Sequence, residues 1–255
     1  MTPHAVHYLP IVTTVLSALF LVALLRHWNR RRSGPHLLWW AFGMFTYGLG
    51  TGLESTITLF GNSVGLTKAW YIAGALLGGY PLAQGSVYLL MRRRTAHWLT
   101  GVSLPFLAVA ALCVVLSPVR LEELLPHKPA GSVLAWEWVR WMTPVINLYA
   151  VVFLIGGAIL SALRFARMRG EGIDAAGNGA RALGNALIAF GALLPGIGGT
   201  MAKAGVVEAL YVGELVGLLF IFAGYRACAT AGAAQPARVS AGEEGVVDTL
   251  TASTA

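Results

Sequence analysis

Charged side chains are scarce in this chain of 255 residues. Asp, Glu, Lys and Arg together make up 11% of it, whereas a soluble globular domain carries about 25% charged residues. A chain so poor in charge could not cover a water-exposed surface, and 56% of its residues are hydrophobic. The composition therefore excludes an ordinary soluble domain and indicates an integral membrane protein.

Motifs for catalysis and metal binding are also missing. The two cysteines, Cys113 and Cys228, lie far apart in the sequence, so neither a disulfide framework nor a CxxC metal motif is present. The histidines lie at the ends of apolar stretches or between them, which disfavours haem ligation and a histidine-based metal site. The chain has no GxSxG, HExxH or P-loop motif. We therefore expect no catalytic residue, no metal and no cofactor.

What the chain does contain is a series of apolar stretches, each close to the roughly 20 residues that cross a bilayer as a helix. They predict an all-α bundle of seven transmembrane helices within residues 1–226. The remaining residues, 227–255, are rich in Ala, Gly, Ser and Thr and predict a disordered cytoplasmic tail. The predicted spans cover residues 8–25, 37–60, 69–91, 98–116, 139–163, 182–202 and 206–225.

The net charge of +7 comes largely from arginines that follow apolar stretches. Nucleic-acid binding could also explain such a charge, but clusters next to spans favour the positive-inside rule, so we expect no nucleic-acid partner. The clusters fall after the first, third and fifth spans, which places the N-terminus outside and the C-terminus in the cytoplasm. We expect a multi-pass protein of the inner (plasma) membrane. The clusters are Arg30–Arg32, Arg92–Arg94 and the arginines of residues 164–181.

Two carboxylates lie inside the predicted spans, where a charged side chain costs on the order of 2.5–3.5 kcal/mol. Glu54 lies about six residues, or ~9 Å, from the outer end of its span, and Glu214 about eight residues, or ~12 Å, from the same surface. The similar depth suggests an outward-opening polar pocket that binds a ligand or titrates a proton. The alternative is an interhelical contact that only fixes packing.

Other polar residues of the outer half complete the predicted pocket, and Arg140, near its rim, could pair with the acids. The full set of predicted ligand-binding residues is Glu54, Glu214, Asn147, Tyr211, Arg140 and Tyr71.

The sixth predicted span contains Pro195 and Gly196, within the sequence LLPGIGGT. Proline removes a helical hydrogen bond and glycine weakens a helix, so we predict a break near the middle of this span. Non-helical backbone at that depth must be buried in protein or line a wet cavity. A packing kink is the alternative.

Two further features favour a structural role. The GxxxG pairs Gly74/Gly78 and Gly213/Gly217 allow close helix packing, within the chain or, alternatively, between two copies. Gln84, deep in the third span, is interpreted as a hydrogen-bonded structural amide that could also donate across helices.

The second and third spans resemble the membrane sensor region of seven-helix bacterial histidine kinases, and stand-alone uncharacterised seven-pass membrane proteins. The resemblance is carried by Trp39 and Trp40, by Gly48 to Glu54, and by the Trp-Tyr-Ile-Ala-Gly sequence of residues 70–74. It implies that the bundle senses an external or lipid-borne signal. Since no kinase domain follows the seventh span in this chain, signalling would use a separate partner.

These observations lead to a hypothesis of a sensor-like or ligand-binding membrane protein without enzymatic activity. Its expected partners are the lipid bilayer, a small ligand or lipid, and a cytoplasmic or membrane signalling protein. A small-solute or proton-coupled transporter that uses the broken sixth span is one alternative. A non-catalytic membrane subunit of a larger complex is the other.

Overall fold

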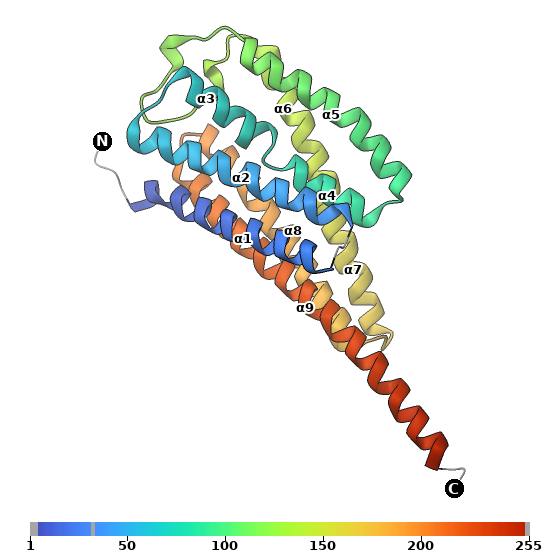
Figure 1. The fold of residues 1–255 in the computed structure, drawn as a ribbon. Helices are drawn as coiled ribbons and strands as arrows, with labels where there is room; N and C mark the ends of the chain where they lie inside the picture. Colours follow the sequence, from blue (N-terminus) through green and yellow to red (C-terminus); the bar gives the residue numbers. More distant parts are fainter. Residues whose placement is uncertain (1–4, 32–33, 253–255) are drawn as a thin grey trace.

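The computed structural model of the chain is a bundle of helices, drawn in Figure 1. The backbone is described for residues 5–31 and 34–252, and side chains for 6–30, 34–174, 176–202 and 204–231. Within these residues there is no β-strand, which confirms the predicted all-α class. The α-helices are α1 Leu9–Arg31, α2 Pro35–Phe60, α3 Val64–Trp70, α4 Tyr80–Leu90, α5 Arg93–Leu116, α6 Glu137–Ala150, α7 Gly157–Gly170, α8 Ala175–Lys203 and α9 Glu208–Ala252.

Five helical stretches of the described chain are long and apolar enough to cross a membrane. The α2 helix and the run from α3 to α4 are not among them. The α2 sequence is diluted by Gly, Thr, Tyr and Trp, whereas the α3–α4 run is interrupted between Leu77 and Gly79. The five stretches are Val6–Arg30, Arg93–Leu116, Glu137–Gly170, Ala176–Ala202 and Glu208–Ala231.

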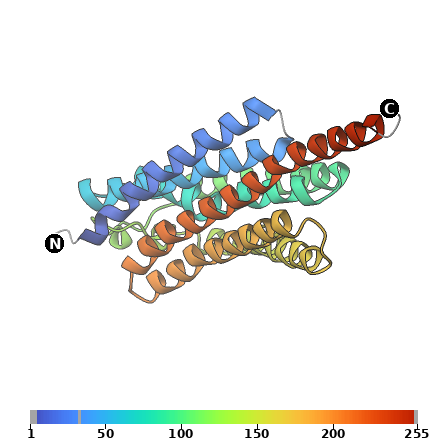
Figure 2. The same ribbon diagram turned by 90° about the horizontal axis from the view of Figure 1, so that it is seen from below.

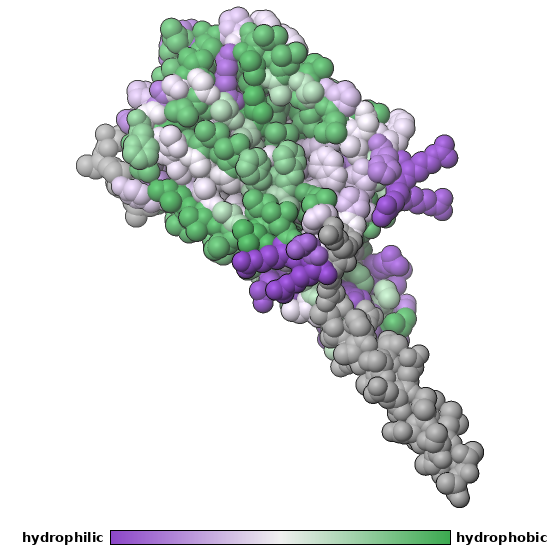
Figure 3. Space-filling view, viewed as in Figure 1, coloured by the Kyte–Doolittle hydropathy of each residue, from purple (hydrophilic) through white to green (hydrophobic). Residues whose placement is uncertain are grey.

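The helices pack around α2, which lies between α1 on one side and α4 on the other. The α8 and α9 helices form the most extensive helix pair, and α7 lies along the other side of α8 (Figure 2). The α9 helix also contacts α1, and it projects beyond the rest of the bundle at its C-terminal end (Figures 1 and 2). Apolar side chains cover most of the face shown in Figure 3.

The α8–α9 pair is held together at glycines spaced seven residues apart. A Cβ added at Gly184 would lie 2.7 Å from the backbone oxygen of Gly224, and one at Gly191 would lie 2.6 Å from that of Gly217. Side chains at these positions would push the helices apart, because small residues are what permits such an approach in lipid. The glycines of the Gly213/Gly217 pair therefore serve packing within the chain.

The predicted break at Pro195 and Gly196 is wrong, because α8 is a continuous helix from Ala175 to Lys203. Proline leaves the carbonyl four residues earlier without its helical donor, here that of Gly191. That carbonyl faces Gly217 of α9, whose lack of a side chain lets the two backbones meet. The close approach of Gly217 covers the unbonded carbonyl, and α8 stays helical through Pro195.

Irregular backbone occurs instead in the third and fifth predicted spans. A π-helical segment, Tyr71–Leu76, joins α3 to the bend before α4, and a second, Val151–Gly156, joins α6 to α7. The first segment packs tightly against α2, since a Cβ added at Gly50 would lie 2.9 Å from the Cα atom of Gly74. The Pro-Gly sequence therefore did not mark where the helices deform.

The predicted tail begins within a helix, and its disorder stays a prediction. The α9 helix continues through the predicted start of the tail at Ala227 and ends at Ala252. Alanine, which is frequent after Tyr225, has the highest helix propensity. The final residues, 253–255, lie outside the described part of the chain.

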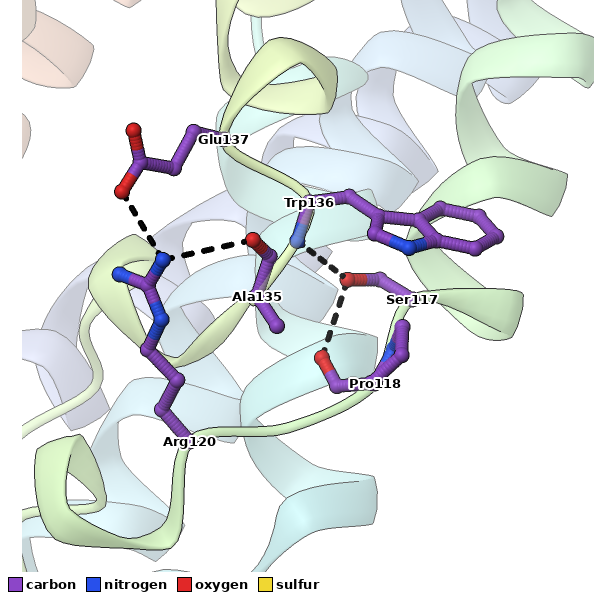
Figure 4. Close-up of polar contacts among 6 residues, drawn as sticks. All are labelled: Ser117, Pro118, Arg120, Ala135, Trp136 and Glu137. Atoms are coloured by element: carbon purple, nitrogen blue, oxygen red, sulfur yellow. Dashed lines mark hydrogen bonds and ion pairs between the residues drawn. The ribbon is translucent and has the colours of Figure 1, made fainter.

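The long connection between α5 and α6 folds onto itself at one end of the bundle (Figure 4). Arg120 makes an ion pair of 2.9 Å with Glu137, and the backbone N–H of Trp136 donates to the Ser117 hydroxyl over 3.2 Å. The Lys68 ammonium donates to the backbone oxygen of Ser117 over 2.8 Å. These polar side chains of the connection are therefore bonded within it or to α3. They are not available to pair with the acids inside the bundle.

Candidate functional site

The carboxyl groups of Glu54, on α2, and Glu214, on α9, lie close enough to interact directly. A carboxylate only accepts hydrogen bonds, so a hydrogen bond between the two groups requires a proton on one of them. The Glu54 residue is 1% exposed. The Glu214 residue is half-buried as a whole, but its Oε2 atom is inaccessible and has no hydrogen-bond partner among the described residues.

Two tyrosines flank the acid pair, one on each helix. The Tyr47 hydroxyl donates to the backbone oxygen of Glu214 over 3.1 Å, so its hydrogen atom is not used for the carboxyl groups. The Tyr211 residue is 2% exposed, and its hydroxyl lies 3.3 Å from that of Thr58. Both tyrosines bridge α2 and α9 at the level of the acids.

The surroundings differ on the two sides of the pair. Toward the N-terminal end of α9, Tyr211 also meets the His7 ring, with centroids 6.3 Å apart. In the opposite direction, Met44 and Leu218 belong to a buried apolar cluster that also contains Phe20. The pair therefore has polar neighbours on the side of Tyr211 and His7 and an apolar layer on the other side.

No basic side chain neutralises the pair within the described residues, where the ion pair between Arg120 and Glu137 is the single salt bridge. The described side chains also include no group of three His, Cys, Asp or Glu residues placed to hold a metal ion. A proton shared by the two acids would balance their charge.

The structure does not bring the predicted residues Asn147, Arg140 and Tyr71 to the acids. Asn147 and Arg140 are exposed on α6, and the Tyr71 hydroxyl lies 2.8 Å from that of Thr143. The α6 helix packs against α4 and α5 rather than α9. These residues were selected because their predicted depth matches that of the acids. Depth carries no information on which helices are neighbours.

Two residues of the site, Tyr47 and Thr58, were not selected from the sequence. Both lie on the Glu54 face of α2, since residues four and seven positions apart share one side of a helix. A search of this face for hydrogen-bonding side chains would have found them.

A second group of buried polar residues surrounds Gln84, which lies on α4. The Gln84 side chain, which is 0% exposed, donates to the Thr100 hydroxyl over 2.7 Å and accepts from the Tyr149 hydroxyl. It also lies 3.4 Å from the backbone oxygen of Ala96. All its polar atoms are bonded, as expected for the structural amide that the sequence predicted.

Comparison with protein-family models, curated protein sequences and solved structures finds no match to this chain. The resemblance to histidine-kinase sensor regions therefore stays a prediction, and any function must be argued from the geometry of the acid pair.

Proposed function

We propose that this protein is a sensor-like or ligand-binding multi-pass membrane protein, and that the Glu54–Glu214 pair is its site. One observation carries the proposal: two carboxyl groups from distant parts of the chain are in contact within apolar helices. Ionisable groups at such depth are costly and mark functional sites by default. A contact that only fixed packing would need no acidic side chains, because neutral amides and hydroxyls could serve.

The proposed arrangement has seven spans, with the N-terminus outside and the C-terminus in the cytoplasm of the inner membrane. The α2 helix and the α3–α4 run lie alongside the five apolar stretches and supply the other two spans. Strongly hydrophilic groups gather toward the end of the bundle from which α9 projects (Figure 3), as the positive-inside rule requires of a cytoplasmic end.

The long α9 helix supports a signalling role. It carries Glu214 within the bundle and projects from the bundle at its C-terminal end (Figure 1). A change at the acid pair would act on the same helix that a cytoplasmic signalling partner could contact. Transport through a broken sixth span lacks its structural basis, since α8 is continuous.

The proposal is tested by replacing both acids in Glu54→Gln/Glu214→Gln. Thermal stability of the purified protein is measured across pH and with panels of small cations, organic amines and lipids. We expect wild type to respond to pH or to one of these compounds, and the double variant not to respond.

Glu208→Gln is the matched control, because it removes an exposed acid from the same helix. It should respond as wild type does. Identical behaviour of wild type and the double variant under all conditions would refute the proposed site.

A further inference from the structure

We propose that the ligand held between Glu54 and Glu214 is a proton, and that its release toward the outer side separates α9 from α2. This inference rests on the proposed function and adds the identity of the ligand and the movement that it controls.

The direct contact of the two carboxyl groups is the first reason. The two carboxyl groups are close enough to interact directly, which leaves no room for an ion or an organic cation between them. Glu54 and Tyr211 are almost completely buried. A surface cavity of about 460 Å³ does lie nearby, between α1 and α2, but neither acid lines it. A proton is the one cation that this closed arrangement accommodates.

The layers around the pair indicate the direction of exchange. On the outer side, hydroxyl and imidazole groups of Tyr211, Thr58 and His7 offer hydrogen-bonding positions. The apolar cluster around Met44 and Leu218 closes the inner side. A proton can therefore leave to water on the outer side, and the structure favours a one-sided sensor over a conductor.

The titratable groups that face the pair are few. Tyr47 on α2 and Tyr211 on α9 are its closest neighbours, with His7 beyond Tyr211. The exposed Glu208, at the start of α9, lies near Tyr211 and not against the acids. The α8 helix approaches α9 at glycines. The α1 helix packs against both α2 and α9, and its His27 contacts Tyr225, eleven residues along α9 from Glu214. Thus no described basic residue of α2, α8 or α9 is placed to compensate for a lost proton.

Loss of the proton would leave two carboxylates in contact, and their repulsion acts between α2 and α9. The connection between these two helices consists of side-chain contacts, namely the acid pair, the Tyr47 bond and the Tyr211–Thr58 contact. The α8–α9 connection consists of direct backbone contact at Gly191 and Gly217. The α2–α9 contact is therefore the one that opens, and α8 moves with α9.

The first test is infrared difference spectroscopy of wild-type protein in liposomes while the pH is raised. The C=O band of a protonated carboxyl group should disappear, and this change should be absent from Glu54→Gln/Glu214→Gln but present in Glu208→Gln. With the protein in one orientation, a pH change on the N-terminal side should produce it and a change on the other side should not. A band that does not respond while the protein stays folded overturns the inference.

The second test measures distances between spin labels in a Cys113→Ser/Cys228→Ala background. Labels at the exposed positions Phe60 and Val212 report on α2 and α9, and labels at Leu183 and Val212 report on the α8–α9 pair. Raising the pH should lengthen the first distance by about 2 Å, a typical helix shift, and leave the second unchanged. A constant first distance, or equal changes in both, overturns the proposed movement.

The outcomes separate the two proposals. If pH has no effect but a cationic compound changes the first distance in a way that needs both acids, the proton is refuted and the ligand-binding site stands. If neither pH, nor any compound, nor the double glutamine variant changes the distances or the stability, both proposals fail.

Discussion

The acid pair and the Gln84 cluster are both buried polar groups, yet they are built in opposite ways. At Gln84 a neutral amide finds a partner for each polar atom, on α5 and α6. At the pair two acidic groups of the same kind face each other, and Glu214 Oε2 has no described partner. A satisfied neutral network fixes one arrangement, whereas an acid pair has two protonation states with different energies. The difference identifies the first as structural and the second as a site that can respond.

The largest expected effect comes from the close contact between α8 and α9, the helix that carries Glu214. Gly217→Ala places a methyl group 2.6 Å from the Gly191 backbone oxygen, and such overpacking should cost about 3 kcal/mol. Thermal unfolding in detergent measures it. Gly196→Ala is the control, since its methyl group meets nothing within 4 Å. Equal stability of the two variants would contradict the account of the α8–α9 contact.

A smaller loss is expected when the amide cluster is broken. Gln84→Leu leaves the buried Tyr149 hydroxyl without its acceptor, which should cost about 2 kcal/mol. Because the lost groups are neutral, the cost should be the same at every pH. Unfolding curves at several pH values measure this, and a strongly pH-dependent loss would show that the cluster is not the neutral network described above.

The acid pair should give a pH-dependent effect of at least about 1 kcal/mol, the repulsion of two unit charges 4 Å apart in bulk water. Deprotonation places two carboxylates in contact, so wild-type stability should fall as the pH rises. Glu214→Gln removes one charge and supplies an amide donor, and it should be the more stable protein at high pH. The same unfolding measurements test this, and a wild-type stability that rises with pH would contradict it.

The smallest effects are expected from removing single hydroxyl groups, one in the Gln84 cluster and one beside the acid pair. Tyr149→Phe should cost about 1 kcal/mol, since it leaves the Gln84 oxygen without a donor. Tyr211→Phe breaks only a 3.3 Å contact with Thr58, and should cost less than about 0.5 kcal/mol. Thermal unfolding of both variants side by side is the measurement. A larger loss for Tyr211→Phe would mean that its hydroxyl bonds the acids directly.

Residue type and depth predicted part of the site. Glu54 and Glu214 were selected because carboxylates are costly in apolar helices, and they do meet. Asn147 and Arg140 were selected by the same depth argument and lie on the exposed face of α6. The argument succeeded where the cost of burial was high enough to require a partner, and failed where a side chain could remain at the surface.

The sequence by itself determined that the chain is helical and apolar enough for a membrane, because composition and the length of apolar stretches follow from residue chemistry alone. It also predicted that the two acids lie at similar depth, since a helix rises by a fixed distance per residue. Only the tertiary structure decided that α2 and α9 are neighbours at that depth, and that Gly217 shelters the carbonyl freed by Pro195. Which helices touch depends on how side chains from distant segments fit together, and no local pattern in the chain records it.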